Sequence, residues 1–301
     1  MEKEQKSNNI QITKRFISLE KIIASKNPRL LKAIPKILLS WFKKLIHLDR
    51  INEIIYKYRD IQGADFAQKV LDEIGVKVEV VNPEFIPKDG RALIVSNHPS
   101  GGIDGLALMA EVAKFRKDIL FPVNDLLCQL PSLKSVFIPI NKYGRNSSNH
   151  EILNKAFSSD SLMMFFPAGT ESKLQNGVVR DLSWKKTFIN KAIEYKRDIV
   201  PVYIEAKNTN FFYRLAYFRR KLGIKANFEL IFLPDEMFKQ KNKTIRLTFS
   251  PTIPYNILDN SLSAKQWANV FENYTYSLKD NPNSVFDKDK EKEKINKKSI
   301  N

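Results

Sequence analysis

One histidine and one aspartate are spaced so that they could share a proton. His98 comes two positions after the end of a predicted strand, residues 91–96, and Asp104 comes six positions later, after Pro-Ser-Gly-Gly-Ile. A neutral imidazole can take the proton of a hydroxyl as that oxygen attacks an acyl carbonyl, and a carboxylate behind the ring stabilises the imidazolium. Because the substrate would supply the hydroxyl, this chemistry needs no nucleophilic serine or cysteine. In the alternative interpretation, Asp104 only caps a helix and His98 only fills a turn.

A second group of residues lies in the segment 162–172, whose sequence is LMMFFPAGTES. An apolar strand is predicted to end at Phe166 and Pro167, and Gly169 and Thr170 then form a turn with exposed backbone N–H groups. Such a turn suits an oxyanion or a phosphate. It is not a P-loop, because no Gly-Lys-Ser/Thr follows it.

The remaining candidates carry weaker signals. Arg145 follows the apolar run 136–140. Its guanidinium could hold an anionic group, and the alternative is a surface arginine in a polar loop. His47 and His150 lie in polar surroundings and are interpreted as surface histidines. The single cysteine, Cys128, excludes a disulfide framework and a multi-cysteine metal site.

Short apolar strands alternate with helical segments from residue 61 onward. Strands are predicted at residues 76–81, 91–96, 119–123, 136–140, 162–166, 199–204, 228–233 and 244–249, and helices at 64–74, 105–115, 149–157, 184–195 and 264–278. This alternation predicts an α/β fold in which helices flank a mostly parallel sheet. Ligands meet such sheets at the carboxyl ends of the strands, where His98 and the turn at 169–170 are expected.

Residues 1–60 are predicted to form a basic amphipathic helical region that associates with membranes. Apolar side chains that include Trp41 and Phe42 recur at helical spacing, and lysines follow the opposite face. The pattern spans residues 29–50 and predicts one amphipathic helix there. A proline fits only near the first turn of a helix, so Pro35 places the start of this helix at residue 34 or 35. Such a helix can lie in a membrane interface, and the alternative is an ordinary helix packed on the core.

The composition describes a basic globular protein. Of the 301 residues 43% are apolar, and the net charge is +17. Residues 1–60 carry 14 basic and 6 acidic side chains, whereas residues 61–120 carry 7 and 9. Basic ends suit an anionic partner, such as a phospholipid leaflet or a nucleic acid. No stretch without a charged residue exceeds 12 residues, and because a spanning helix needs about 20 apolar residues, none is predicted.

Two other segments bear on possible partners. The tail, residues 281–301, is highly charged and is predicted to be disordered, which leaves residues 61–280 as one domain. The stretch 211–221 mixes aromatic and basic residues and could stack nucleic-acid bases. At helical spacing its rings are instead expected to pack inward, with its cations facing solvent or lipid head groups. Because no nucleic-acid-binding motif accompanies it, no nucleic-acid partner is predicted.

Together and in this order, the motifs resemble those of the glycerolipid (lysophospholipid) acyltransferase superfamily, whose first block is Asn-His-x4-Asp and whose third is Phe-Pro-Glu-Gly-Thr-Arg-Ser. The matching residues are Asn97 and His98 in the first block and Phe166, Pro167, Gly169, Thr170 and Ser172 in the third. The run before Arg145 is similar to the second block, and Val200-Pro201 to the fourth. The pattern His-Pro-x-Gly-Gly-x-Asp-Gly looks like that of the hemolysin-like branch, which is related to ornithine- and glycine-lipid O-acyltransferases. The resemblance implies a glycerol-3-phosphate acyltransferase-like domain at residues 61–280.

The sequence departs from the common superfamily pattern at three places. One extra residue separates His98 from Asp104, Ala168 replaces a glutamate, and Glu171 replaces an arginine. In the superfamily the last two positions are implicated in holding the glycerol phosphate of the acceptor. Their replacement implies an acceptor with a different head group, such as lyso-ornithine or lyso-glycine lipid, whose attacking hydroxyl belongs to its acyl chain.

The resemblance thus implies a lysolipid O-acyltransferase. His98, oriented by Asp104, would take the proton of the acceptor hydroxyl as it attacks the thioester of an acyl carrier protein or coenzyme A, with neither a metal nor a bound cofactor. The implied substrate-binding residues are Arg145, Phe166, Pro167, Gly169, Thr170, Glu171 and Ser172, and backbone donors near Gly169 and Thr170 are candidates for the oxyanion site. The enzyme would be cytoplasmic and peripheral on the inner face of the cytoplasmic membrane. The alternative, motivated by Ala168 and Glu171, is a non-catalytic peripheral membrane-binding protein with an acyltransferase fold.

Overall fold

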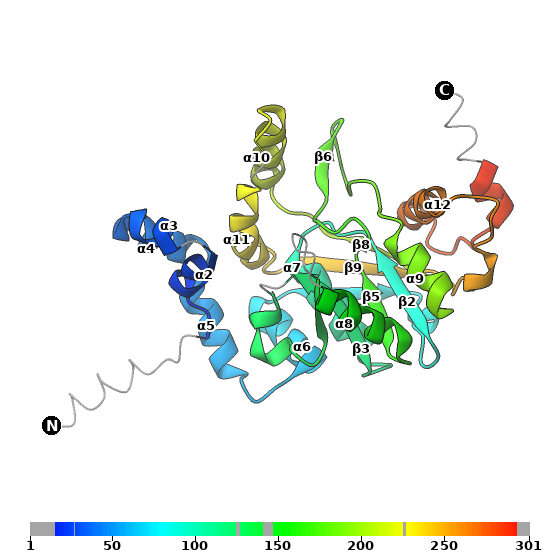
Figure 1. Cartoon of the computed structure of the whole chain (residues 1–301), viewed down its shortest axis with the longest axis horizontal. Coiled ribbons are helices and arrows are strands. Elements are labelled where there is room, and N and C mark those ends of the chain that lie inside the picture. The colour runs from blue at the N-terminus through cyan, green and yellow to red at the C-terminus, as the bar shows by residue number, and fades with distance from the viewer. Residues whose placement is uncertain (1–15, 27, 125–126, 141–146, 225–226, 294–301) are drawn as a thin grey trace.

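A seven-stranded sheet forms the centre of the protein (Figure 1). The computed structural model describes residues 16–26, 28–124, 127–140, 147–224 and 227–293. Across the sheet the strands are β1 (Lys77–Val81), β9 (Thr244–Phe249), β8 (Asp198–Glu205), β2 (Ala92–Ser96), β5 (Leu162–Phe165), β3 (Ile119–Asn124) and β4 (Phe137–Ile140). Every neighbouring pair is parallel except β8 and β9. The predicted α/β fold with a mostly parallel sheet flanked by helices is confirmed.

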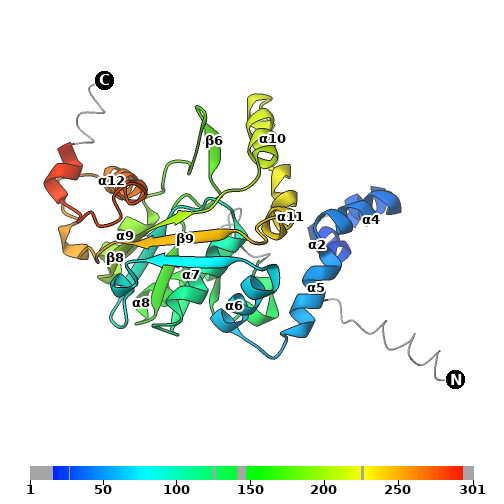
Figure 2. The ribbon, with the colours of Figure 1, turned by 180° about the vertical axis from the view of Figure 1, so that it is seen from behind.

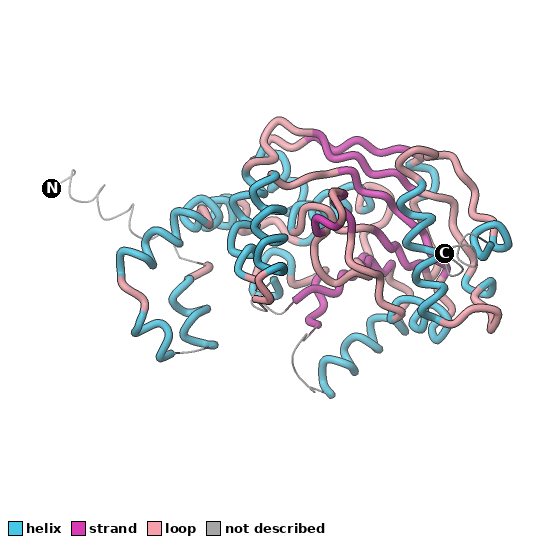
Figure 3. Tube along the Cα trace, turned by 90° about the horizontal axis from the view of Figure 1, so that it is seen from above, coloured by secondary structure: helices cyan, strands magenta, loops and turns pink. Residues whose placement is uncertain are grey.

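Helices cover both faces of the sheet (Figure 3). The first face packs against α6 (Gly63–Ile74) and α7 (Gly102–Val112), and the second against α8 (Ser147–Ser158), α9 (Thr187–Tyr195) and α12 (Ala264–Ser277). Successive side chains of a strand point to opposite faces, so in β2 Ile94 joins the core of the first face, and Leu93 and Val95 join that of the second. All five residues of β2 are buried, as expected for a central parallel strand.

The other elements lie around the sheet and its helices. An antiparallel hairpin is formed by β6 (Lys173–Gln175) and β7 (Val178–Arg180), and α10 (Asn210–Lys221) and α11 (Leu233–Phe238) lie beside it. The N-terminal helices are α2 (Leu19–Lys26), α3 (Pro28–Ala33), α4 (Lys36–Leu45) and α5 (Leu48–Lys57), which extend to one side of the sheet (Figure 2). The short 3-10 helices are η1 (Pro83–Phe85), η2 (Leu127–Gln129), η3 (Pro131–Leu133), η4 (Phe228–Phe232) and η5 (Tyr255–Ile257).

The amphipathic N-terminal helix α4 begins at Lys36, one residue later than the predicted start at residue 34 or 35. Pro35 directly precedes α4, which contains no buried residue. Part of its apolar face is open to solvent, with Ile37 85% and Trp41 52% exposed, whereas Phe42 and Leu45 are half-buried. By contrast, Ile54 and Ile55 of α5 are buried in the core. In the part of the chain that the structure describes, the core therefore holds α5 and leaves part of the apolar face of α4 uncovered. Among the described residues, no helix is long and apolar enough to cross a bilayer.

His47 is not the solvated surface histidine that the sequence suggested. It adopts a left-handed conformation with φ 51° at the break between α4 and α5. Its Nε2 lies 2.9 Å from Oδ1 of Asp235, and its ring packs against that of Phe238 at a centroid distance of 4.9 Å. Because both partners belong to α11, His47 ties the N-terminal helices to the helix beside the carboxyl edge of the sheet.

Two other expectations are corrected by the structure. The segment predicted as a strand at 228–233 forms the 3-10 helix η4, because Glu229 turns inward to pair with Arg219 while its apolar neighbours face outward. The tail, predicted to be disordered, is ordered through residue 293, since the ring of Phe286 packs on Phe271 at 5.4 Å. Tyr274 also donates a hydrogen bond to the carbonyl of Ser284. Residues 294–301 lie outside the described part of the chain.

The register of two neighbouring strands determines what meets at the carboxyl edge. In β2 and β5, Leu93 pairs with Met163 and Val95 with Phe165. Because the strands are parallel and in register, the segments that follow them emerge side by side. The first chemical motif, at His98, therefore lies next to the third, which begins at Phe166.

Candidate active site

His98 and Asp104 form a hydrogen-bonded pair at the end of β2. Nδ1 of His98 lies 3.1 Å from Oδ2 of Asp104, whose side chain is fully buried. The same oxygen accepts hydrogen bonds from the backbone N–H of Ser100 at 2.7 Å and of Gly101 at 3.0 Å. The aspartate therefore caps α7 and orients the imidazole at once, so the capping role and the pairing role predicted from the sequence coexist.

Gly101 accommodates the extra residue in this loop. Its φ of +88° lies in a region that side-chain-bearing residues rarely adopt, and a Cβ there would meet Cδ2 of Leu233 at 3.0 Å. This glycine makes the turn that returns the chain to α7. Asp104 thus reaches His98 across a longer spacing than in the common motif.

The ring of His98 is held against that of Phe166. The two rings stack with centroids 3.9 Å apart and planes inclined by 17°. Phe166 rests in turn on Phe121, at a centroid distance of 5.1 Å. With Nδ1 at Asp104 and one face on Phe166, the imidazole has a defined orientation. In the described part of the chain no hydrogen bond engages Nε2, and the side chain is 17% exposed.

Asp181, which sequence reasoning missed, holds the His98 segment to the third motif. Its Oδ1 accepts a hydrogen bond from the backbone N–H of His98 at 3.2 Å and one from the hydroxyl of Ser172 at 2.5 Å. Ser172 also donates its N–H to the carbonyl of His98 at 2.7 Å. The second oxygen of Asp181 accepts from Nε1 of Trp184 at 2.9 Å. Burial raises the pKa of Asp181, and the hydrogen bonds from Ser172 and Trp184 oppose this rise.

Asn97 has a structural role in the first block. Its side-chain oxygen accepts from the N–H of Ile204 at 2.7 Å, and its amide donates to the carbonyl of Ile204 at 2.9 Å. This pair of bonds joins the end of β2 to β8. Val200 of β8 is fully buried, which confirms that the fourth apolar motif is core.

The turn after Phe166 presents fewer free donors than its sequence suggested. Gly169 has φ +70°, and its N–H donates to the carbonyl of Phe166 at 3.0 Å, so this N–H is already engaged. The carbonyl of Pro167 accepts from the N–H of Lys185 at 3.1 Å. A Cβ at Gly169 would lie 3.1 Å from Nζ of Lys185. The exposed cation of Lys185, which no motif marked, therefore lies at this turn.

A family model described as acyltransferase matches residues 21–285. The chain belongs to the acyltransferase family. Two relatives bear the name lyso-glycine lipid O-acyltransferase. The protein from Bacteroides thetaiotaomicron is 42% identical over 265 residues, which cover 87% of this chain and 97% of the relative. The protein from Phocaeicola vulgatus is 38% identical over 265 residues, covering 87% and 95%. The predicted membership in the glycine-lipid-related branch of the lipid acyltransferases is thereby confirmed.

A solved structure also resembles this acyltransferase. It is the 1-acyl-sn-glycerophosphate acyltransferase PlsC from Thermotoga maritima, with 16% sequence identity and a TM-score of 0.44. The match covers 81% of this chain and 97% of that chain.

Glu171 of the acyltransferase lies in a buried chain of charges. The carboxylate accepts a hydrogen bond from Oγ1 of Thr170 at 2.7 Å and pairs with Nζ of Lys173. Lys173 continues to Glu229 at 3.0 Å, and Glu229 pairs with Arg219 at 2.7 Å. Burial alone would raise the pKa of Glu229, but its hydrogen bonds and the charge of Lys173 hold that pKa below its usual value. Glu171 replaces the arginine of the common motif, and its carboxylate thus contacts Thr170 and Lys173 inside the protein.

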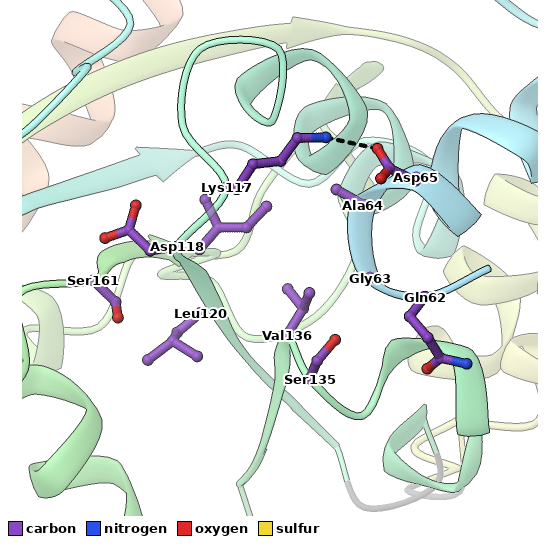
Figure 4. A pocket seen from close by; sticks show the side chains of 11 residues that line it. Gln62, Gly63, Ala64, Asp65, Lys117, Asp118, Leu120, Ser135, Val136 and Ser161 are labelled. Carbon is purple, nitrogen blue, oxygen red and sulfur yellow. Dashed lines mark hydrogen bonds and ion pairs between the residues drawn. The ribbon is translucent and has the colours of Figure 1, made fainter. Parts of the chain in front are cut away.

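One predicted substrate-binding residue and one cavity stand apart from this site. Arg145 lies outside the described residues, so its place relative to His98 stays a prediction. A cavity of about 320 Å³ is lined by Gln62, Asp65, Lys117 and Ser135, among others (Figure 4). It is lined by the first turn of α6 and by residues that precede or begin β3, β4 and β5, so it lies at the amino edge of the sheet, opposite His98. This cavity is separate from the candidate site around His98.

Proposed function

We propose that this acyltransferase transfers a fatty acyl group from an acyl thioester to the hydroxyl of lyso-glycine lipid. The observation that carries the proposal is the fixed imidazole of His98, with Nδ1 on the buried Asp104 and one face on Phe166. The names of the two relatives support the acceptor. Glu171 pairs with the buried Lys173, and neither Glu171 nor Ala168 supplies a cation that could bind a phosphate. This agrees with an acceptor other than a glycerol phosphate.

The proposed reaction uses His98 first as a base and then as an acid. Nε2 takes the proton of the acceptor hydroxyl as its oxygen attacks the thioester carbonyl, and Asp104 stabilises the resulting imidazolium. The tetrahedral intermediate collapses, the C–S bond breaks, and the imidazolium returns its proton to the departing thiolate. The products are the O-acylated lipid and the free thiol of an acyl carrier protein or coenzyme A, and no bound cofactor takes part.

The turn at residues 167–170 is proposed to stabilise the oxyanion. Because the N–H of Gly169 is engaged by Phe166, the N–H of Thr170 is the better donor of the two. Lys185 adds a positive charge at the same turn. A cation here suits the carboxylate of a glycine head group or a phosphate of the thioester carrier.

The decisive assay uses the purified full chain with lyso-glycine lipid and either an acyl carrier protein thioester or acyl-CoA. We expect the O-acylated product by mass spectrometry, with lyso-glycine lipid preferred over lysophosphatidate by about tenfold or more. Equal rates with both acceptors would refute the proposed selectivity. Acylation of lysophosphatidate alone would refute lyso-glycine lipid as the acceptor, but it would still support the acyltransferase reaction.

We further propose that α4 contacts an anionic membrane. Its exposed face carries Ile37 and Trp41, and Lys44 is exposed in its last turn, where Lys43 pairs with Glu20. Helices with apolar residues on one face and lysines beside them lie in the membrane interface. Since the acceptor is a lipid, an enzyme held at the leaflet meets it there.

The double change Ile37→Asp and Trp41→Asp should reduce sedimentation with vesicles that contain phosphatidylglycerol, by about tenfold. The melting temperature should stay within a degree or two of the parent, because neither side chain is buried. The matched control is Ile193→Asp with Val285→Asp, which charges two exposed apolar residues on α9 and in the C-terminal segment. Unchanged sedimentation, or an equal loss in the control, would count against this role of α4.

A further inference from the structure

We propose that α10 and η4 form a second membrane-binding surface, in addition to α4. This surface docks on an anionic phospholipid leaflet next to the catalytic loop, by which we mean residues 97–101 between β2 and α7. This inference rests on the proposed function, because its consequence is that the lysolipid reaches His98 directly from the leaflet. We define the α10–η4 surface by its exposed apolar residues, which are Phe211, Tyr217, Phe218, Leu222, Ile224, Phe228, Leu230 and Ile231.

The outer face of α10 is an uncovered apolar stripe. Phe211, Phe218 and Leu222 lie seven and four positions apart, which places them on one side of the helix, and they are 53%, 57% and 75% exposed. The inner face carries Phe212 and Tyr213, which are buried. The rings of this stretch therefore divide between two faces, whereas the sequence suggested that they all pack inward.

The helix η4 extends this stripe and is held in place by a buried ion pair. Phe228, Leu230 and Ile231 are exposed, whereas Glu229 between them is fully buried and contacts Arg219 of α10. The ring of Phe232 also meets that of Phe211 at a centroid distance of 5.3 Å. The apolar residues are thus displayed on a fixed scaffold.

The charges of this surface match an anionic leaflet. Arg214, Arg220 and Lys221 are exposed on α10, and the ion pairs found among the described residues include none of them. The only acidic residue between positions 210 and 232 is Glu229, which is buried and paired with Arg219. Large apolar side chains with unpaired cations beside them suit the boundary between acyl chains and anionic head groups.

The inner face of the same helix supports the catalytic loop. The hydroxyl of Tyr213 donates to the carbonyl of Pro99 at 2.9 Å, next to His98 in the chain. Leu233, directly after η4, packs against Gly101. In Figure 1, α10 projects from the sheet beside the β6 hairpin. A leaflet on the outer face of α10 would therefore lie one helix away from the loop that carries His98.

The test compares the full chain carrying Phe218→Asp and Leu222→Asp with the Ile193→Asp and Val285→Asp control. Each protein is sedimented with phosphatidylglycerol–phosphatidylcholine vesicles that contain no substrate. We expect binding by the α10 variant to fall about fivefold or more, with binding by the control and both melting temperatures unchanged. Unchanged vesicle binding by the α10 variant, or an equal loss in the control, would overturn the proposal.

A second measurement separates this surface from the proposed reaction. The ratio of acylation rates with vesicle-embedded and detergent-dispersed lysolipid should fall in the α10 variant and stay constant in the control. If no variant or parent acylates any lysolipid while the selective loss of vesicle binding persists, the docking surface stands and the proposed function falls. The α10 variant could also bind vesicles normally and instead lose dimerisation or the gel shift of a nucleic acid. That result would assign the surface to a second copy of the chain or to a nucleic acid, and would overturn the proposal that it binds a leaflet.

Discussion

Replacing His98 with alanine is expected to lower the rate of acyl transfer by about 10²–10⁴-fold. The change removes the nitrogen that takes the proton from the acceptor hydroxyl, while the backbone bonds of this residue to Asp181 and Ser172 remain. Circular dichroism and the melting temperature should therefore show a folded protein. Initial rates at saturating lyso-glycine lipid and thioester measure the loss.

His47→Ala is the matched control for this prediction. His47 is also bound to an aspartate, but its partner is Asp235 of α11, and it lies outside the loop that carries His98. Its loss should leave acylation of detergent-dispersed acceptor within a few-fold of the parent. A His98→Ala protein that retains thioester-dependent acylation would show that His98 is not the base. A parent protein without acylation would favour the non-catalytic membrane-binding alternative.

The arrangement of His98, Asp104 and Phe166 at the carboxyl edge of the sheet could be predicted because its sequence signals are local. The apolar runs of β2 and β5 identify two buried strands, and the motifs follow closely after them. Parallel pairing in register then brings His98 and Phe166 together without further information. The spacing from His98 to Asp104 fits within one loop and one helical turn, so the pair was also accessible from sequence.

Residues that act over long sequence separations were not predictable in this way. Asp181 lies 83 positions from His98, and nothing near it in the chain identifies it as the carboxylate that holds the loop. Lys173 and Glu229 are 56 positions apart. A lysine near a strand end normally faces solvent, and only the tertiary structure shows that this one is buried.

The predictions of a strand at residues 228–233 and of a disordered tail were also wrong because contacts between distant residues outweigh the local composition. The segment Phe-Glu-Leu-Ile-Phe has the residue types of a strand, but Glu229 must reach Arg219 and the chain coils to place it there. In the tail, one aromatic side chain, Phe286, finds a place against Phe271 and Tyr274. Its burial orders a segment whose average composition resembles that of a disordered chain.

The buried charges connect two parts of the acyltransferase for which functions are proposed above. Thr170 and Glu171 belong to the turn proposed to stabilise the oxyanion, whereas Arg219 and Glu229 hold the α10–η4 surface together. Lys173 joins the two, because its ammonium contacts both Glu171 and Glu229. Removing this lysine should therefore affect folding stability and the turn together.

Lys173→Met is expected to lower the free energy of unfolding by about 3–5 kcal/mol, because it leaves the buried Glu171 without a counter-ion. Adding Glu171→Gln should restore much of that loss, since the uncompensated charge is then removed. Urea unfolding of the parent, single and double variants measures both effects, and Lys117→Met, at an exposed ion pair with Asp65, serves as the control with an unchanged midpoint. A loss below about 1 kcal/mol for Lys173→Met, or no recovery in the double variant, would show that the buried carboxylates are stabilised without this lysine.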